Sequence, residues 1–314
     1  VVRGSVGTGF RAPTLSDLHL PSIPGLVFGF PDPLRCPVTG AEEDCGEGFY
    51  RSKGGGNPDL QPESSRSLNA GIVLEPAKGL SLTVDYYRIR IEDLIVAVPI
   101  NAIFSDYARW SPTHVFRLPP DPAQPGLAGP IDYILATNVN AGTRETAGFD
   151  LDVRYRFPAS RWGRFSASLT GTYVSECEAS EFEDAAPGTA DLVTGIGAIS
   201  RWRHYLALDW SRGSWGATLA QTFQLGYDEK DLTTCDPATF VCPGRRRVGS
   251  LSIWDLQVRY TGVKGLTASA GIRNLFDRDP PTATSAQTFQ VGYDASYADP
   301  RGRMVYLTLG YAWR

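Results

Sequence analysis

The sequence predicts an all-β protein whose strands form an antiparallel, up-and-down transmembrane β-barrel. Three observations predict this fold: ten segments alternate apolar and polar residues, short and long connections alternate between them, and aromatic residues recur near their ends. In the clearest segment, from Phe149 to Phe157, the odd positions are apolar or aromatic and the even positions are charged. Successive side chains of a strand point to opposite faces, so one face is apolar and the other ionic. A soluble sandwich would bury that apolar face under a second sheet, whereas a membrane barrel turns it toward lipid.

The ten expected strands follow one another along the whole chain. They are expected over residues 1–8, 64–75, 80–96, 144–157, 164–176, 200–211, 214–228, 247–261, 265–276 and 302–314. In the sixth, one face holds Trp202, His204, Leu206, Leu208 and Trp210, and the other holds Arg201, Arg203 and Asp209. Residues 165–173 and 254–260 alternate in the same way. The aromatic residues near strand ends are typical of the interfacial girdles of membrane barrels.

The connections between these strands alternate in length. Tight Gly- and Pro-containing turns are expected at 76–79, 158–163, 212–213 and 262–264. Long loops are expected at 9–63, 97–143, 177–199, 229–246 and 277–301. A compact soluble domain rarely carries several loops above about 15 residues. In bacterial outer-membrane barrels the short turns are periplasmic and the long loops extracellular, so the same sidedness is expected here.

Composition narrows the class of protein further. The 314 residues carry a net charge of −4, and no basic face points to a nucleic-acid partner. No stretch approaches the roughly 20 apolar residues of a membrane helix. Residues 1–7 already have the pattern of a strand, and no export signal precedes them. We therefore expect residues 1–314 to be the C-terminal portion of a single, longer barrel domain.

Two cysteine pairs each lie within one long loop. We expect disulfides between Cys36 and Cys45 and between Cys235 and Cys242, with Cys177 outside both bridges. The alternative is that the loop cysteines remain thiols. Neither pair has the short spacing of a zinc site, and the histidines do not cluster with them, so no metal is expected.

Five short motifs resemble one known family, the TonB-dependent outer-membrane receptors. They are Gly9–Pro13 (Gly-Phe-Arg-Ala-Pro), Asn57–Glu63 (Asn-Pro-Asp-Leu-Gln-Pro-Glu), Ala147–Asp150, Asn274–Asp277 (Asn-Leu-Phe-Asp) and Pro300–Arg303. Each is weak alone, but together, in this order, they cover the whole chain. One departure is the end of the chain, where Trp313 precedes a final Arg314 in place of a terminal aromatic residue.

The resemblance implies a barrel of about 22 strands plugged by an N-terminal domain, of which this chain would supply ten strands and no plug. It implies active import of a scarce, bulky nutrient: a ferric siderophore, cobalamin, haem or an oligosaccharide. The implied partners are the plug, the inner-membrane TonB complex acting on an N-terminal TonB box, and outer-membrane lipid with lipopolysaccharide. The implied location is the outer membrane of a Gram-negative bacterium. No cofactor is implied.

Candidate ligand groups lie in the long loops. They are Arg109, Trp110, Arg117, Arg245, Arg246 and Arg247, since arginine suits an anionic iron chelate and aromatic rings suit a sugar face. The alternative is that these residues are solvated or contact anionic lipopolysaccharide. The lumen-facing charges are expected to pair across strands and hold the plug.

No catalytic motif is present, so an enzyme is not expected. A passive porin is the alternative function, and a barrel enzyme or adhesin is a third.

Overall fold

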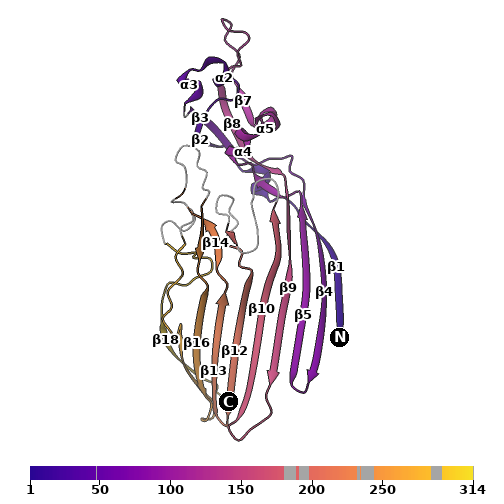
Figure 1. Cartoon of the computed structure of the whole chain (residues 1–314), viewed down its shortest axis with the longest axis vertical. Helices are drawn as coiled ribbons and strands as arrows, with labels where there is room; N and C mark the ends of the chain where they lie inside the picture. Colours follow the sequence, from indigo (N-terminus) through magenta and orange to yellow (C-terminus); the bar gives the residue numbers. More distant parts are fainter. Residues whose placement is uncertain are drawn as a thin grey trace.

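The computed structural model places ten long strands in one antiparallel sheet that follows chain order (Figure 1). The structure describes residues 1–46, 48–179, 189–190, 198–231, 234, 244–283 and 292–313. The strands are β1 (Val2–Arg11), β4 (Glu63–Ala77), β5 (Leu80–Glu92), β9 (Thr143–Arg156), β10 (Arg164–Ala179), β12 (Trp202–Arg212), β13 (Trp215–Gln224), β16 (Leu251–Tyr260), β17 (Leu266–Arg273) and β18 (Met304–Tyr311). Each predicted strand corresponds to one of them, so the fold class and strand order are confirmed.

The strand register places polar residues beside polar residues and apolar residues beside apolar ones. Asp150 on β9 lies opposite Thr172 on β10, and the Thr172 hydroxyl donates to its carboxylate over 2.7 Å. Phe149, on the other face, contacts the Tyr86 ring with centroids 5.3 Å apart. A slip of one residue would exchange the two faces. The predicted division of residues 149–157 into an ionic and an apolar face is therefore observed.

Aromatic side chains mark both ends of the apolar face. Near the short turns, Trp215 contacts Tyr260 at 4.7 Å between centroids, and Trp210 donates from Nε1 to the Trp162 carbonyl. Trp202 lies on the same face as Trp210, eight residues away along β12. At about 3.3 Å per residue this separation is about 26 Å, which matches the apolar band of an outer-membrane barrel. The face is thus built to contact lipid between two girdles.

The first two long loops fold together into a second sheet beyond the outer ends of the strands (Figure 1). It contains β2 (Ile23–Phe30), β3 (Gly48–Gly55), β8 (Ile131–Asn140), β6 (Ile95–Ala97) and β7 (Val115–Arg117). The accompanying helices are α1 (Leu15–His19), α2 (Cys36–Thr39), α3 (Glu42–Cys45), α4 (Ile100–Ser105) and α5 (Tyr107–His114). Ile103 and Trp110 from the helices pack with Val27, Tyr50 and Ile134 of the strands. We call this unit the loop sheet.

These segments were expected only as long loops between barrel strands, and the strands within them were not predicted. β3 and β8 even pair in parallel, from Arg51 opposite Tyr133 to Gly55 opposite Thr137. A smaller sheet joins β11 (Thr189–Ala190), β14 (Tyr227–Lys230) and β15 (Arg245–Val248), with β11 parallel to β14. Several expected strands also end early: β13 stops at Gln224, β17 at Arg273 and β18 at Tyr311, and β5 is separated from β6 by a break at Asp93, whose φ is +58°.

One predicted disulfide is present. Cys36 and Cys45 are joined, with their Cα atoms 4.7 Å apart, and they tie α2 to α3. Cys235 and Cys242 lie outside the described residues. Cys177 is buried in β10 in its thiol form. No helix in the described part of the chain is long and apolar enough to cross a membrane.

Candidate functional site: the lumenal wall and the outer loop sheets

The ionic face of the ten-stranded sheet is a wall of cross-strand polar pairs. Arg3 on β1 reaches over Gly71 of β4 to pair with Asp85 of β5. A Cβ at Gly71 would collide with the Asp85 carboxylate, so a larger residue here would displace the carboxylate from this position. Arg154 pairs with Asp152 at 3.1 Å, and Thr170 donates to the same carboxylate. In the middle of the wall, acidic residues are therefore compensated locally.

The same face holds further charged residues. Asp255 accepts a hydrogen bond from the Asn274 backbone N–H over 2.8 Å. The Arg203 guanidinium lies 5.8 Å from the centroid of the Tyr297 ring. Arg201 precedes β12, at its outer end. These residues lie where the alternation predicts, and the pairing across strands expected for this face is observed for Asp150 and Asp152.

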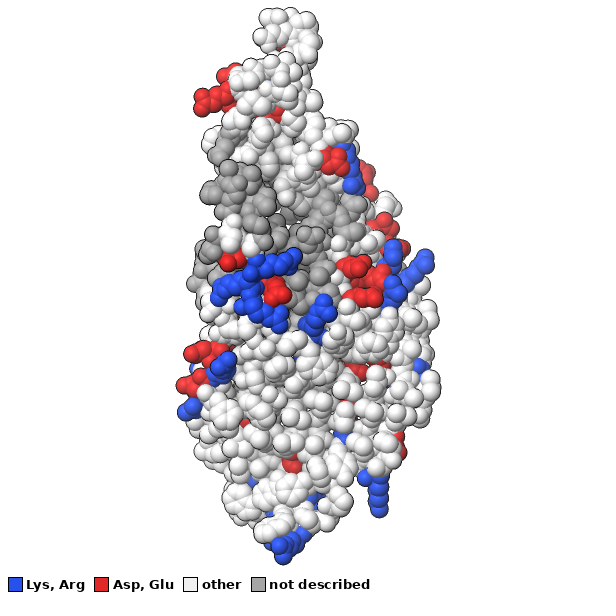
Figure 2. Space-filling model, viewed as in Figure 1, with Lys and Arg blue, Asp and Glu red and all other residues white. Residues whose placement is uncertain are grey.

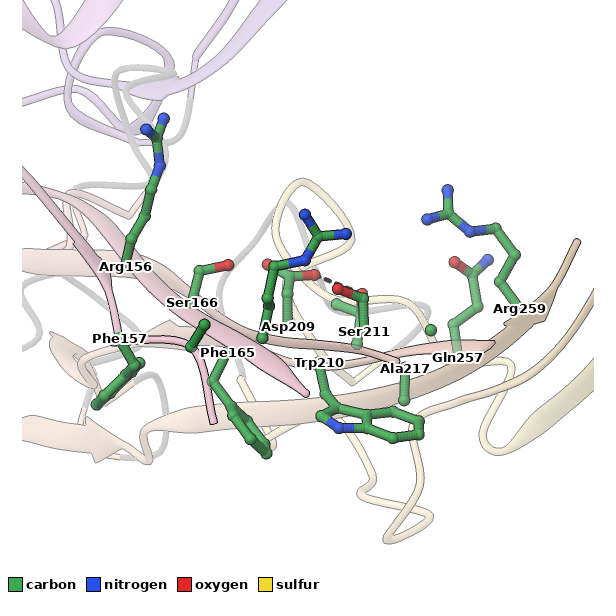
Figure 3. A pocket seen from close by; sticks show the side chains of 14 residues that line it. Arg156, Phe157, Phe165, Ser166, Asp209, Trp210, Ser211, Ala217, Gln257 and Arg259 are labelled. Carbon is green, nitrogen blue, oxygen red and sulfur yellow. Dashed lines mark hydrogen bonds between the residues drawn. The ribbon is translucent and has the colours of Figure 1, made fainter. Parts of the chain in front are cut away.

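At the short-turn end, the wall is hollowed into a concavity of about 590 Å³ (Figure 3). Figure 3 shows Arg156, Asp209 and Arg259 on one side of the sheet and Phe157, Phe165 and Trp210 on the other. Arg164 also lines this concavity. Asp209 accepts a hydrogen bond from the Thr218 hydroxyl over 2.6 Å. The concavity therefore contains more cations than anions.

Arg117, a predicted ligand residue, lies inside the loop sheet. Its guanidinium donates to both Asp32 oxygens at 2.8 and 2.7 Å, to the Gly129 carbonyl and to the Tyr107 hydroxyl. Asp32 is only 2% exposed. Burial alone would raise the pKa of Asp32, but hydrogen bonds from Arg117 and the Leu34 backbone lower it below its usual value. The geometry assigns Arg117 to holding the loop sheet together.

Arg109 and Trp110 lie on α5 of the same unit. Trp110 is 8% exposed and contacts His114 edge-on, with centroids 5.1 Å apart. The Arg109 guanidinium lies over the Trp110 ring at 4.7 Å. Trp110 therefore belongs to the loop-sheet core, and Arg109 covers it from outside.

The three consecutive arginines are on β15 of the smaller sheet. Arg247 pairs with Asp228 at 3.1 Å, and Arg246 lies 3.6 Å from the fully buried Glu229. Arg245 is exposed and faces Lys230 in the register of β14 and β15. The predicted ligand residues thus fall into two groups, one in the loop sheet with its helix α5 and the other on β15 of the smaller sheet.

The uncovered face of the loop sheet was not predicted from the sequence. Opposite the helices, this face exposes Leu26, Phe28, Phe49, Arg51, Lys53 and Phe116, which lie beside the half-buried Tyr133. Phe28 and Phe49 meet edge-to-face at 5.0 Å, and Phe116 stacks on Tyr133 at 4.5 Å. The Lys53 ammonium lies 3.4 Å from the Tyr133 centroid. The sequence signal for this face was the alternation of Phe49, Arg51 and Lys53 with smaller or buried residues.

Comparison with known proteins identifies the class. A family model described as "TonB dependent receptor-like, beta-barrel" matches residues 1–275. The chain therefore belongs to the TonB-dependent receptor family and supplies part of its β-barrel, as the sequence motifs indicated.

Individual relatives share this architecture. The chain is similar to a mutant form of the ferric enterobactin receptor PfeA from Pseudomonas aeruginosa, with a TM-score of 0.64, 17% identity, and coverage of 99% of this chain and 38% of that chain. It is similar to the siderophore receptor PirA from Acinetobacter baumannii, with a TM-score of 0.64, 16% identity, and coverage of 99% and 39%. At these sequence identities, both similarities show a shared fold.

A curated relative agrees in sequence over a shorter stretch. The chain is 30% identical over 125 residues to the iron-regulated outer membrane virulence protein of Vibrio cholerae serotype O1, which covers 39% of this chain and 16% of that protein. The chain thus spans well under half the length of these relatives. No cluster of three metal-ligating side chains occurs among its described residues.

Proposed function

We propose that the full-length protein is an outer-membrane transporter that imports a ferric siderophore, energised by the inner-membrane TonB complex. The observation that carries this proposal is the family match over residues 1–275. The relatives are named as a ferric enterobactin receptor, a siderophore receptor and an iron-regulated outer membrane protein. These names support iron as the cargo. No enzymatic activity is proposed.

The wall of the sheet supports transport through an aqueous lumen. Its apolar face presents side chains such as Phe149, Leu208 and Val258, which remain exposed outside any protein core. Its other face presents charged side chains and hydroxyls. A lipid-facing band and a hydrated lumen require this division, because an Arg or Lys in the lipid near the midplane costs about 2–4 kcal/mol.

We propose that the uncovered face of the loop sheet receives the ligand from outside. Phe28 and Phe49 are 54% and 74% exposed, which is unusual for large rings in a packed unit. Arg51, with 71% of its side chain exposed, is adjacent. Aromatic rings offer flat apolar contact and arginine offers paired donors to anionic oxygens. This combination suits an iron chelate with aryl or carboxylate ligating groups.

The arginines predicted from the sequence differ in how accessible they are to a ligand. Arg245 and Arg109 are placed to contact a ligand or lipopolysaccharide from the loop surfaces. Arg246 and Arg247 have acidic partners on β14, so a ligand would compete with these pairs. Arg117 is excluded from ligand contact by its burial with Asp32.

Growth under iron limitation tests the function. A strain lacking the gene is complemented with the full-length protein and supplied with single ferric chelates as the only iron source. The proposal expects growth on at least one chelate to require both the gene and the TonB complex. Growth that requires the gene but not the TonB complex would instead support the passive porin.

A further inference from the structure

Charge compensation on the lumenal wall changes from the middle to the short-turn end. In the middle, Arg3 pairs with Asp85 and Arg154 pairs with Asp152. At the short-turn end, Arg156, Arg164 and Arg259 line the concavity of Figure 3, and none forms an ion pair within the described residues. A positive excess therefore lies at the end of the wall that faces the periplasm in this class of barrel.

The acidic groups around this concavity do not cancel the excess. Asp209 is the one carboxylate among its lining residues, and the Thr218 hydroxyl already donates to it. The adjoining turns contribute further cations, Lys78, Arg161, Arg212 and Lys264, against Glu75 at the end of β4. Figure 2 shows this basic character as blue side chains at the lower tip of the molecule. The local field therefore favours anions.

We propose that Arg156, Arg164 and Arg259 form an exit subsite, a lumenal binding site that holds anionic cargo just before release to the periplasm. The inference rests on the proposed function and adds the charge of the cargo: the imported chelate carries net negative charge. Arginine forks bind carboxylate and phenolate oxygens through paired hydrogen bonds. Ser166, Ser211 and Gln257 in the same lining add neutral hydrogen-bonding groups.

The geometry fits a small molecule. A concavity of about 590 Å³ lies within the range of small-ligand sites, about 300–1,000 Å³. Three cations drawn from β9, β10 and β16 surround it on a curved wall, so one compact polyanion can contact several of them. Because the compensated middle of the wall holds anions less strongly, the gradient directs an anion toward the exit.

Uptake by the full-length protein in cells tests the exit subsite. The variant is Arg156→Gln with Arg259→Gln, and the matched control is Arg154→Gln, which lies on the same strand and face but is paired with Asp152. The probes are radioiron-labelled chelates, an anionic ferric tricatecholate and an uncharged ferric trihydroxamate. We expect the double variant to lower maximal tricatecholate uptake about 5- to 10-fold, with binding to de-energised cells changed by less than about twofold.

A charge-retaining variant separates this role from assembly. Arg156→Lys with Arg259→Lys should restore most of the uptake, while Arg154→Gln should leave it within about twofold of wild type. Heat-modifiable barrel in the outer membrane confirms that each variant is assembled.

Three results would overturn the inference. They are unchanged tricatecholate uptake in the double Gln variant, import of only the uncharged chelate by the wild type, and new sensitivity to a large antibiotic that the outer membrane normally excludes. The last would show that the arginines instead hold polypeptide that closes the lumen. Failure of the wild type to import any iron chelate would count against the proposed function itself, a separate outcome.

Discussion

At the residue scale, burial separates arginines that build the loops from arginines that can meet a ligand. Arg117 and Arg245 are indistinguishable as cationic residues of predicted loops. In the structure, 15% of the Arg117 side chain is exposed and its guanidinium holds the 3%-exposed side chain of Asp32, whereas Arg245 is exposed on β15. The sequence could not show this, because the pairing joins two loops that are far apart along the chain.

Removal of the Asp32 charge should loosen the loop sheet. Asp32→Asn leaves Arg117 buried without its ionic partner, and breaking a buried pair costs about 3–5 kcal/mol. We expect faster proteolysis and faster amide exchange in residues 23–55 and 115–140 of the full-length protein. Asp132→Asn, which breaks the exposed pair with Arg51, is the matched control and should cost less than about 1 kcal/mol. Equal effects of the two variants would contradict the assignment.

Acid should loosen the same unit. The pKa of Asp32 is lowered in the folded protein, and the pKa of Asp44 is lowered by its hydrogen bond from Arg35. A carboxyl with a lowered folded pKa stabilises the fold above its unfolded pKa, about 4, and that stabilisation is lost as pH falls through the folded value. Amide protection of the loop sheet should therefore be constant near neutral pH and decline below about pH 4. Protection that rises on acidification would contradict these assignments.

At the element scale, each strand has one register that keeps charge out of lipid. β9 illustrates this, with Asp152 and Arg154 paired on one face and Tyr155 contacting Phe157 on the other. Four charged residues lie at alternating positions that point to the lipid-facing side: Arg66, Arg88, Arg90 and Glu145. All four are beyond the outer aromatic residues, toward the loops. The apolar band thus has a defined upper limit.

Two substitutions on β9 test the faces. Val153→Arg places a charge in lipid at a cost of about 2–4 kcal/mol, so the level of assembled full-length protein in the outer membrane should fall. Arg154→Val changes only the lumenal wall and should leave assembly near wild type. The measurement is the amount of heat-modifiable protein in outer-membrane fractions. Greater damage from Arg154→Val would mean that the faces are inverted.

The elements divide into those that local pattern predicts and those that it does not. The ten long strands were predictable because period-two alternation and tight turns are local signals. The loop sheet was not, because its parallel pairing of β3 with β8 joins segments from two different loops. Phe49, Arg51 and Lys53 alternate with residues of the other face, as in a strand. Three alternating positions inside a long loop are too few to predict a strand.

The candidate site was predicted less well than the fold. The lumenal charges Asp150, Asp152 and Arg154 follow from alternation alone. The lack of ion-pair partners for Arg156 and Arg259 follows only from cross-strand register, since it depends on which residues of β10, β12, β13 and β16 lie beside them. Sequence reasoning could name the arginines of the wall but not the imbalance among them.

At the scale of the whole molecule, the described sheet is open. β1 and β18 are its two edge strands, and they do not pair with each other. An unpaired strand edge is unstable in lipid because its backbone groups lack hydrogen-bond partners. Residues 1–314 expressed alone with an export signal should therefore not yield heat-modifiable monomers in the outer membrane. Stable membrane-inserted monomers of this segment would show that the sheet closes by itself.

We propose that this wall belongs to an energised importer of iron chelates. The most direct measurement is the initial rate of radioiron uptake, from the chelate that supports growth, by cells that carry the full-length protein, with and without the TonB complex. We expect saturable uptake that falls to the level of cells lacking the protein when the TonB complex is removed. Uptake that is unsaturable and unchanged without the complex would contradict it, because it would describe a passive channel.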